Sequence, residues 1–157
     1  MTILRSLLAL LLLTSLVACS DDNPTDDGST DDPNNSTEYK NEATAKINGT
    51  DWTATNIIAT RNDAGGVTAI TFTAFGANDS RISFGMAFGS VKEHTIDGQV
   101  VQADFKYEGK SYGEGESGTI TITNLTSTGM RGTFTINANT TGGESGTATG
   151  SFDVKLN

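Results

Sequence analysis

The chain has 157 residues, 18% of them charged, and a formal net charge of −9 at pH 7. An acidic chain without a basic cluster is unsuited to the phosphate backbone, so we expect no nucleic-acid partner. With one cysteine and one histidine, the sequence excludes an internal disulfide and a closed Cys/His zinc site. We therefore predict no metal and no cofactor.

Residues 1–18 have the features of a bacterial export leader. Arg5 precedes an apolar stretch that is shorter than the ~20 residues a membrane-spanning helix needs. The stretch ends in Leu16-Val17-Ala18-Cys19, which resembles the lipobox of bacterial lipoproteins. The resemblance implies cleavage before Cys19 and acylation of its thiol. The alternative is a secretory peptide with an incidental cysteine.

The residue after the cysteine bears on which membrane holds the chain. In bacterial lipoproteins, an aspartate directly after the lipidated cysteine usually retains the chain at the inner membrane. Ser20 stands here instead. The resemblance therefore implies a lipid anchor in the outer membrane, with the domain in the periplasm or on the cell surface.

Residues 19–42 are predicted to be the lipidated cysteine and a disordered acidic tether. From Ser20 onward this segment holds six aspartates and two glutamates against one lysine, both prolines of the chain, and one aromatic residue, Tyr39. Such a composition cannot build a core. Its aspartate pairs do not fit a calcium loop, because Asn34 stands where the glutamate after Gly28 is required.

Residues 43–157 predict a single all-β domain, because apolar and polar residues alternate through most of the segment and no window carries a helical stripe. One clear example has Val101, Ala103 and Phe105 on a common face. About eight strands are expected, at residues 43–47, 52–61, 67–75, 81–88, 100–107, 119–125, 132–138 and 147–156.

Short connections rich in Gly, Asn and Asp predict antiparallel hairpins between consecutive strands. A meander of this length must curl to protect its edges, so we expect an up-and-down barrel or a flattened barrel. The alternative is a two-sheet β-sandwich. Gly85, Gly132 and Gly150, inside the expected strands, suit the bulges and bends that such curvature needs.

Four aromatic residues of the domain are candidates for a ligand pocket: Trp52, Phe72, Phe84 and Phe105. An eight-stranded barrel is just wide enough either to fill with side chains or to hold one small ligand. The sequence leaves both possibilities open.

Residues suited to catalysis are few. His94 is expected at a surface loop or strand end, and no pattern around a serine resembles a nucleophile elbow. Glu114 and Glu116 are expected in a flexible loop. Two carboxylates can hydrolyse glycosides when they are rigidly held, so a small glycan-acting enzyme is one alternative. The prediction is that the chain is not an enzyme.

The domain opens with Ala45-Lys46-Ile47-Asn48-Gly49-Thr50-Asp51-Trp52, and Gly/Thr-rich strands at 118–123, 132–136 and 150–154 close it. In these features it resembles a family of uncharacterised lipoproteins of Bacteroidetes-type bacteria. The resemblance implies an all-β domain in the cell envelope and supplies no activity.

From these features we expect a monomeric, non-enzymatic binding module that contacts an unknown ligand through loops 89–99 and 108–117. The alternative is a lipocalin-like carrier with a small apolar ligand inside the barrel.

Overall fold

The computed structural model describes residues 38–157, and all of the regular structure in this range is β. The prediction of an all-β domain is therefore confirmed. In this part of the chain there is no helix with the length and apolarity to cross a bilayer. The predicted leader at 1–18, Cys19 and most of the predicted tether lie outside the described residues. The strands are β1 (Glu42–Ile47), β2 (Thr50–Ala64), β3 (Val67–Gly76), β4 (Arg81–Met86), β5 (Glu93–Thr95), β6 (Val101–Tyr107), β7 (Lys110–Tyr112), β8 (Glu114–Leu125), β9 (Gly129–Asn139) and β10 (Ser145–Lys155).

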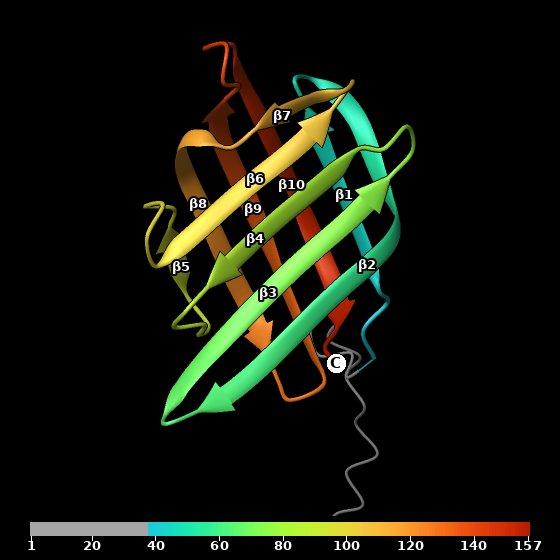
Figure 1. Ribbon diagram of the computed structural model, residues 1–157. Coiled ribbons are helices and arrows are strands. Elements are labelled where there is room, and N and C mark those ends of the chain that lie inside the picture. The colour runs from blue at the N-terminus through green and yellow to red at the C-terminus, as the bar shows by residue number, and fades with distance from the viewer. Residues whose placement is uncertain (1–37) are drawn as a thin grey trace, which may run out of the picture.

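The ten strands form one antiparallel sheet in the order β5-β8-β9-β10-β1-β2-β3-β4-β6-β7. Most consecutive strands pair as hairpins, as expected, and β1 also pairs with β10 near the C-terminus. Figure 1 shows the sheet folded into two facing layers, with β2 passing from one layer to the other. The register of β2 against β3 shifts between Ala54 and Asn56, which lets the strand bend at this place.

The sheet is not closed, so the fold is a flattened, open barrel rather than a complete up-and-down barrel. The open seam lies between β6–β7 and β5–β8. At one end of the seam, the Gly113 amide, just after β7, donates to the Asn139 carbonyl of β9 at 3.1 Å. The Ile96 amide donates to the Gly118 carbonyl at 3.0 Å and extends the pairing of β5 with β8 by one residue. These bonds satisfy backbone groups near the edges that would otherwise be free to pair with another chain.

Two of the ten strands were not expected. β5 and β7 have three residues each and lie within segments 89–99 and 108–117, which were predicted as loops. β5 pairs with β8, and β7 pairs with β6. Deleting either segment would therefore remove strand pairing as well as loop surface.

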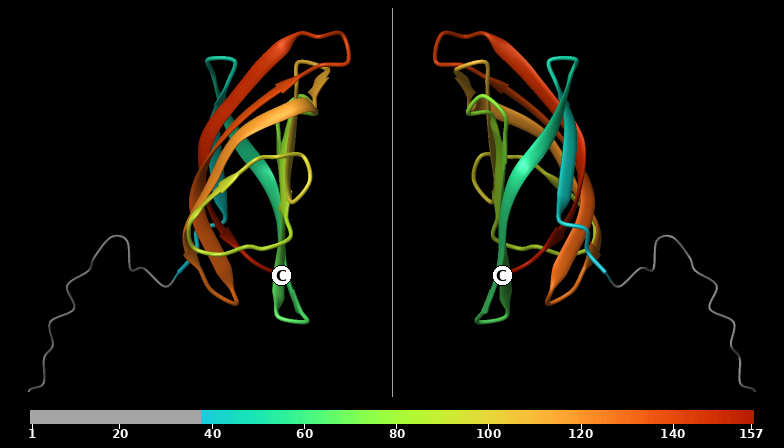
Figure 2. Two further views of the ribbon diagram at one scale, coloured as in Figure 1. Left: turned by 90° about the vertical axis from the view of Figure 1, so that its left-hand side faces the viewer. Right: turned by 90° about the vertical axis from the view of Figure 1, so that its right-hand side faces the viewer.

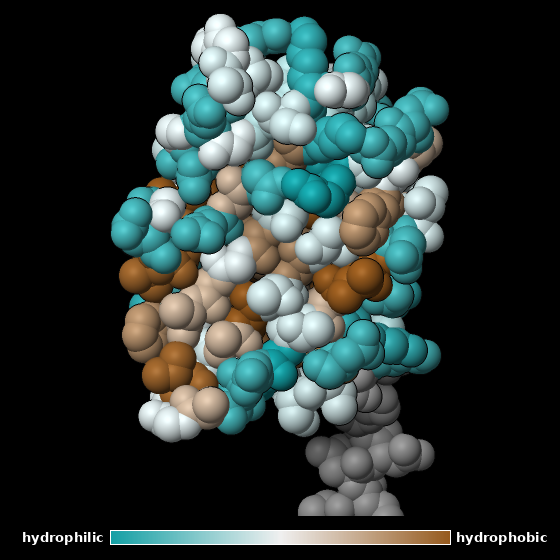
Figure 3. Space-filling model, viewed as in Figure 1, coloured by the Kyte–Doolittle hydropathy of each residue, from teal (hydrophilic) through white to brown (hydrophobic). Residues whose placement is uncertain are grey.

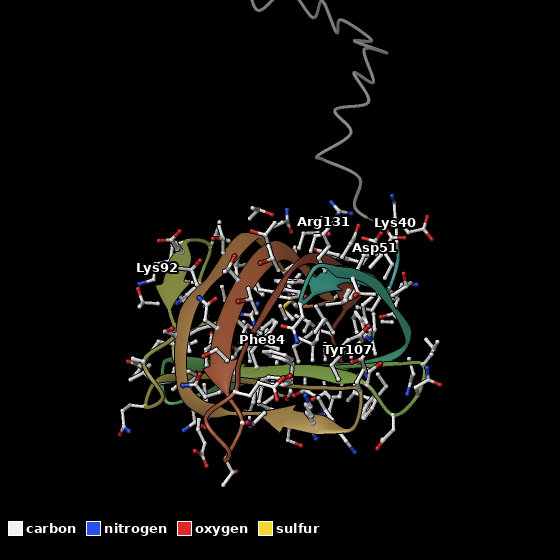
Figure 4. All side chains as sticks on the ribbon, turned by 90° about the horizontal axis from the view of Figure 1, so that it is seen from above. Lys40, Asp51, Phe84, Lys92, Tyr107 and Arg131 are labelled. Atoms are coloured by element: carbon white, nitrogen blue, oxygen red, sulfur yellow. The ribbon has the colours of Figure 1, made fainter. Side chains whose placement is uncertain are left out.

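The space between the two layers is filled with side chains. The rings of Phe72 and Phe84 stack with centroids 4.6 Å apart, and Phe152 from the opposite layer lies 5.5 Å from each. Phe105 stacks on Tyr112 at 4.5 Å. In the view from above, Phe84 lies inside the barrel (Figure 4). This cluster forms the centre of the hydrophobic core.

The three strand glycines differ in what surrounds them. A Cβ atom at Gly150 would lie 2.1 Å from the Thr44 carbonyl oxygen, and one at Gly132 would lie 2.1 Å from that of Thr121. Gly132 also lies beside a register shift of β8. A Cβ at Gly85 would meet no atom closer than 3.9 Å. Gly132 and Gly150 therefore allow close backbone approach, whereas Gly85 is not sterically required.

The ordered domain begins earlier than the expected boundary at residue 43. Tyr39 is buried, and its hydroxyl donates to Asn124 Oδ1 at 2.6 Å. The Arg131 guanidinium lies 4.8 Å above the centre of the Tyr39 ring, and a Cβ at Gly129 would lie 2.2 Å from that ring. Tyr39 thus attaches the start of the described chain to the β8–β9 hairpin.

Candidate functional site

The four predicted pocket residues do not line a common cavity. Phe72, Phe84 and Phe105 are buried in the core. Trp52 is 6% exposed and borders two surface grooves that none of those three rings lines. The groove that also has Tyr107 in its lining is the candidate site.

The groove has a volume of about 230 Å³ and is referred to below as the distal groove. Its lining residues are Asp51, Trp52, Thr53, Ala77, Asn78, Ser80, Tyr107 and Glu108. They come from the start of β2 and from the β3–β4 and β6–β7 turns. Figure 2 shows the β1–β2 and β9–β10 hairpins at the upper end of the molecule, and the start of the described chain and the C-terminus at the lower end. The β3–β4 and β6–β7 turns, which help to line the distal groove, lie towards the upper end of the molecule, and the described chain begins at its lower end (Figure 1).

Trp52 is held firmly at one wall of the groove. Its indole Nε1 donates to Ser80 Oγ at 2.7 Å, and Ser80 Oγ donates to the Ala77 carbonyl at 2.6 Å. A Cβ at Gly76 would lie 2.2 Å from the indole nitrogen, so only glycine leaves room for the ring. The buried polar edge of Trp52 is thereby satisfied.

Tight turns form the rest of the rim. Asn78 and Asp79 have φ of 54° and 57°, and Glu108 has φ of 49°. Left-handed residues of this kind are typical of the shortest hairpin turns. Lys106 forms an ion pair with Asp79 that joins the two turns. The hydrogen bond from Lys106 lowers the pKa of Asp79.

The groove combines hydrogen-bond acceptors with two aromatic rings. Figure 4 shows Asp51 and Tyr107 on the same flank of the barrel, where they come from β2 and β6. Asp51 and Glu108 contribute carboxylates, and Asn78 contributes an amide. Such a set can accept hydrogen bonds from the hydroxyl or amino groups of a ligand while a ring covers its apolar part. It contains neither a thiol nor an imidazole.

Comparison of the chain with protein-family models, curated proteins and solved structures gave no match. The distal groove is therefore interpreted from its own residues.

His94 lies in β5 and is buried, which corrects the expectation of a surface position. Its Nε2 lies 2.8 Å from the Ser90 carbonyl oxygen. The Ser90 amide nitrogen lies 3.4 Å from the same Nε2, so the imidazole closes the turn that leads into β5.

Glu114 and Glu116 lie in the first residues of β8 and not in a loop. The register of β8 against β9 shifts between Glu114 and Ser117, so the two carboxylates sit at an irregular strand end. Glu116 Oε1 would be 3.3 Å from a Cβ built on Gly98, which places this carboxylate beside the β5–β6 connection. Neither glutamate lines the distal groove.

Asp97 shapes the turn into β6. Its Oδ1 accepts hydrogen bonds from the backbone amides of Gln99, Val100 and Val101, at 3.0, 2.8 and 3.0 Å. The Val101 amide is the largest of the causes that lower the pKa of Asp97. A carboxylate whose pKa is lower in the folded state stabilises the fold at pH values above its unfolded pKa of about 3.9. This stabilisation is lost as the pH falls through the lower pKa of the folded state.

We therefore expect Asp97→Asn to lower the Tm by a few degrees at pH 7, because a neutral amide oxygen is a weaker acceptor. The difference from the unsubstituted chain should begin to shrink as the pH falls to the unfolded pKa of about 3.9, and it should vanish only below the lowered pKa of folded Asp97. Thermal melts at pH 7, 4 and 2.5 measure this. The other acidic groups titrate in both chains, so their effects cancel in the difference between the two Tm values. A Tm difference that stays constant with pH would contradict the prediction.

The structural roles of two residues, one beside the site and one at the other end of the domain, were not predicted. Ser80 is buried and orients Trp52, but nothing in the alternation around it signals this contact. In the sequence, Tyr39 stood out only as the one aromatic residue of an acidic segment. That unusual position was the only sign that its ring packs against the domain.

Proposed function

We propose that this chain is a lipid-anchored, non-catalytic binding module of the bacterial cell envelope. Acylated Cys19 holds it at the outer membrane, and the distal groove contacts the ligand. The lipobox-like Leu16-Val17-Ala18-Cys19 and the resemblance of the domain opening to Bacteroidetes-type lipoproteins support this location.

One observation supports binding on the outside rather than in the interior. The stacked rings of Phe72, Phe84 and Phe152 occupy the centre of the barrel, where a lipocalin-like carrier would hold its ligand. The turns that line the distal groove and the start of the described chain lie towards opposite ends of the domain (Figure 1). A chain tethered through Tyr39 presents the groove away from its point of attachment.

We assign no catalytic role to the candidate residues. The His94 imidazole is engaged with the Ser90 carbonyl, and the carboxylates of Glu114 and Glu116 lie outside the groove. Within residues 38–157 no three His, Cys, Asp or Glu side chains are grouped to hold a metal ion.

Cys19→Ser tests the anchor. We expect the unsubstituted chain in the membrane fraction and the variant almost entirely in the soluble envelope fraction, because serine offers no thiol for the acyl anchor. Fractionation and intact mass measure both the location and the acyl mass. The matched Ser20→Ala variant should remain in the outer membrane, and Ser20→Asp should move to the inner membrane.

The same purified protein tests the mode of binding. We expect mass spectrometry under native conditions to detect no stoichiometric apolar molecule bound to the unsubstituted chain or to the Cys19→Ser variant. A Cys19→Ser variant that stays in the membrane would refute the anchor. A co-purified apolar ligand would instead favour the carrier.

A further inference from the structure

Three apolar side chains gather on one flank of the domain and are exposed to solvent. Phe88 is 57% exposed, Val91 58% and Val100 42%, although most large apolar residues of the domain are buried. The Ala87 amide donates to the Val100 carbonyl, which brings the two ends of this connection together. Figure 3 shows apolar residues on the left-hand flank, where β4 ends and β6 begins. We call Phe88, Val91 and Val100 the flank patch.

Hydrogen bonds place the flank patch towards the tethered end of the domain. The Gly89 amide donates to the Thr68 carbonyl at 2.8 Å, next to the β2–β3 hairpin. The Ile122 amide donates to the Lys92 carbonyl at 2.9 Å, on the strand that continues to Asn124. Asn124 is the residue that accepts the Tyr39 hydroxyl hydrogen bond. The patch and the start of the described chain therefore belong to the same half of the barrel.

The length of chain before residue 38 indicates what covers this patch. Glu38 follows Cys19 by nineteen residues in the sequence, and a coil of that length would reach roughly 20–25 Å on average. An acyl group on Cys19 therefore keeps the lower end of the domain within that distance of the headgroups. At this distance the local concentration of lipid is high, so a few exposed apolar side chains are enough to bring the patch onto the surface.

We propose that the flank patch lies on the lipid surface, with Phe88 and Val91 at the boundary between headgroups and acyl chains. This inference rests on the proposed lipid anchor. Lys92 and Glu93 follow Val91 and are both exposed, so their charges offset each other. Contact is therefore driven by apolar burial and does not require anionic lipid. The distal groove then points away from the membrane.

The experiment uses the single thiol of the chain. A chain beginning at Cys19 is coupled through this thiol to a maleimide lipid in phosphatidylcholine vesicles with plain or brominated acyl chains. Phe88→Trp supplies the probe. Phe75→Trp is the matched control, because Phe75 is 37% exposed and pairs with Arg81 near the β3–β4 turn. Trp52 is almost buried and gives the same background in both chains.

We expect bromine to reduce the added emission of Phe88→Trp about twofold or more and to leave that of Phe75→Trp nearly unchanged. The result should not change between low and high salt. Equal quenching at both positions, or none at either, would overturn the proposal. In the unsubstituted chain, amide exchange of residues 87–92 should slow on vesicles, and unchanged exchange would also overturn it. Because the lipid is attached chemically in this experiment, a negative result would overturn the flank-patch proposal without bearing on whether Cys19 is acylated in cells.

Discussion

Replacing Phe72 with alanine should lower the free energy of unfolding by about 3–5 kcal/mol. Phe72 is buried, and its ring contacts Phe84 at 4.6 Å and Phe152 at 5.5 Å between centroids. Truncation removes these contacts and leaves a cavity, because the two facing layers cannot collapse fully around it. Chemical denaturation monitored by circular dichroism measures the change.

Phe88→Ala is the control for this prediction. The chemical change is the same, but Phe88 is 57% exposed, so we expect the free energy of unfolding to change by no more than about 0.5 kcal/mol. If Phe72→Ala cost as little as Phe88→Ala, the barrel interior would have spare room. The carrier function would then gain support over the binding module.

Gly150→Ala should destabilise the domain by about 1–3 kcal/mol, because the added methyl has no space. It would lie 2.1 Å from the Thr44 carbonyl oxygen and 2.8 Å from Ala45 Cα. These atoms belong to β1, which pairs with β10, so the contact lies between the first and last strands of the described residues. Relief of the clash must move one strand away from the other. Thermal and chemical unfolding both measure the loss.

Gly85→Ala provides the comparison. A Cβ at this site meets no atom closer than 3.9 Å, and Gly85 has no left-handed φ. We expect this variant to be neutral or more stable by about 0.5 kcal/mol, since alanine loses less backbone entropy on folding. Equal destabilisation by both substitutions would mean that loss of strand glycine, and not the close approach of β1 to β10, is responsible.

The proposals for the flank patch and the distal groove support one orientation at the membrane. Exposed Phe88 and Val91 would face lipid, and the groove formed by Trp52 and Tyr107 would face outward. The hydrogen bond from Tyr39 to Asn124 fixes where the described chain enters the domain, at the end nearer the flank patch.

Alternation in the sequence was enough to predict the long strands. Val101, Ala103 and Phe105 are buried on one face of β6 as expected, and Ile82, Phe84 and Met86 are buried in β4. A period of two places every second side chain on the core face, and this depends only on backbone geometry. The same pattern does not continue to Phe88, which lies beyond the end of β4 and is exposed.

The short strands were not predictable by the same means. β5 and β7 have three residues each, too few for an alternation to be recognised. They form because neighbouring edges at the open seam offer unpaired backbone groups. His94 is buried for that reason: its strand pairs with β8, whose Ile120 lies opposite it.

The sequence by itself determined the all-β class, the faces of the long strands and a candidate anchor at Cys19, because each depends on local order along the chain. Only the tertiary structure decided that the phenylalanines fill the interior, that Tyr39 attaches the chain and that Trp52 borders an outer groove. Those outcomes depend on contacts between residues far apart in sequence, such as Phe72 with Phe152 and Trp52 with Ser80. Packing between layers, which alternation along one strand does not describe, sets such contacts.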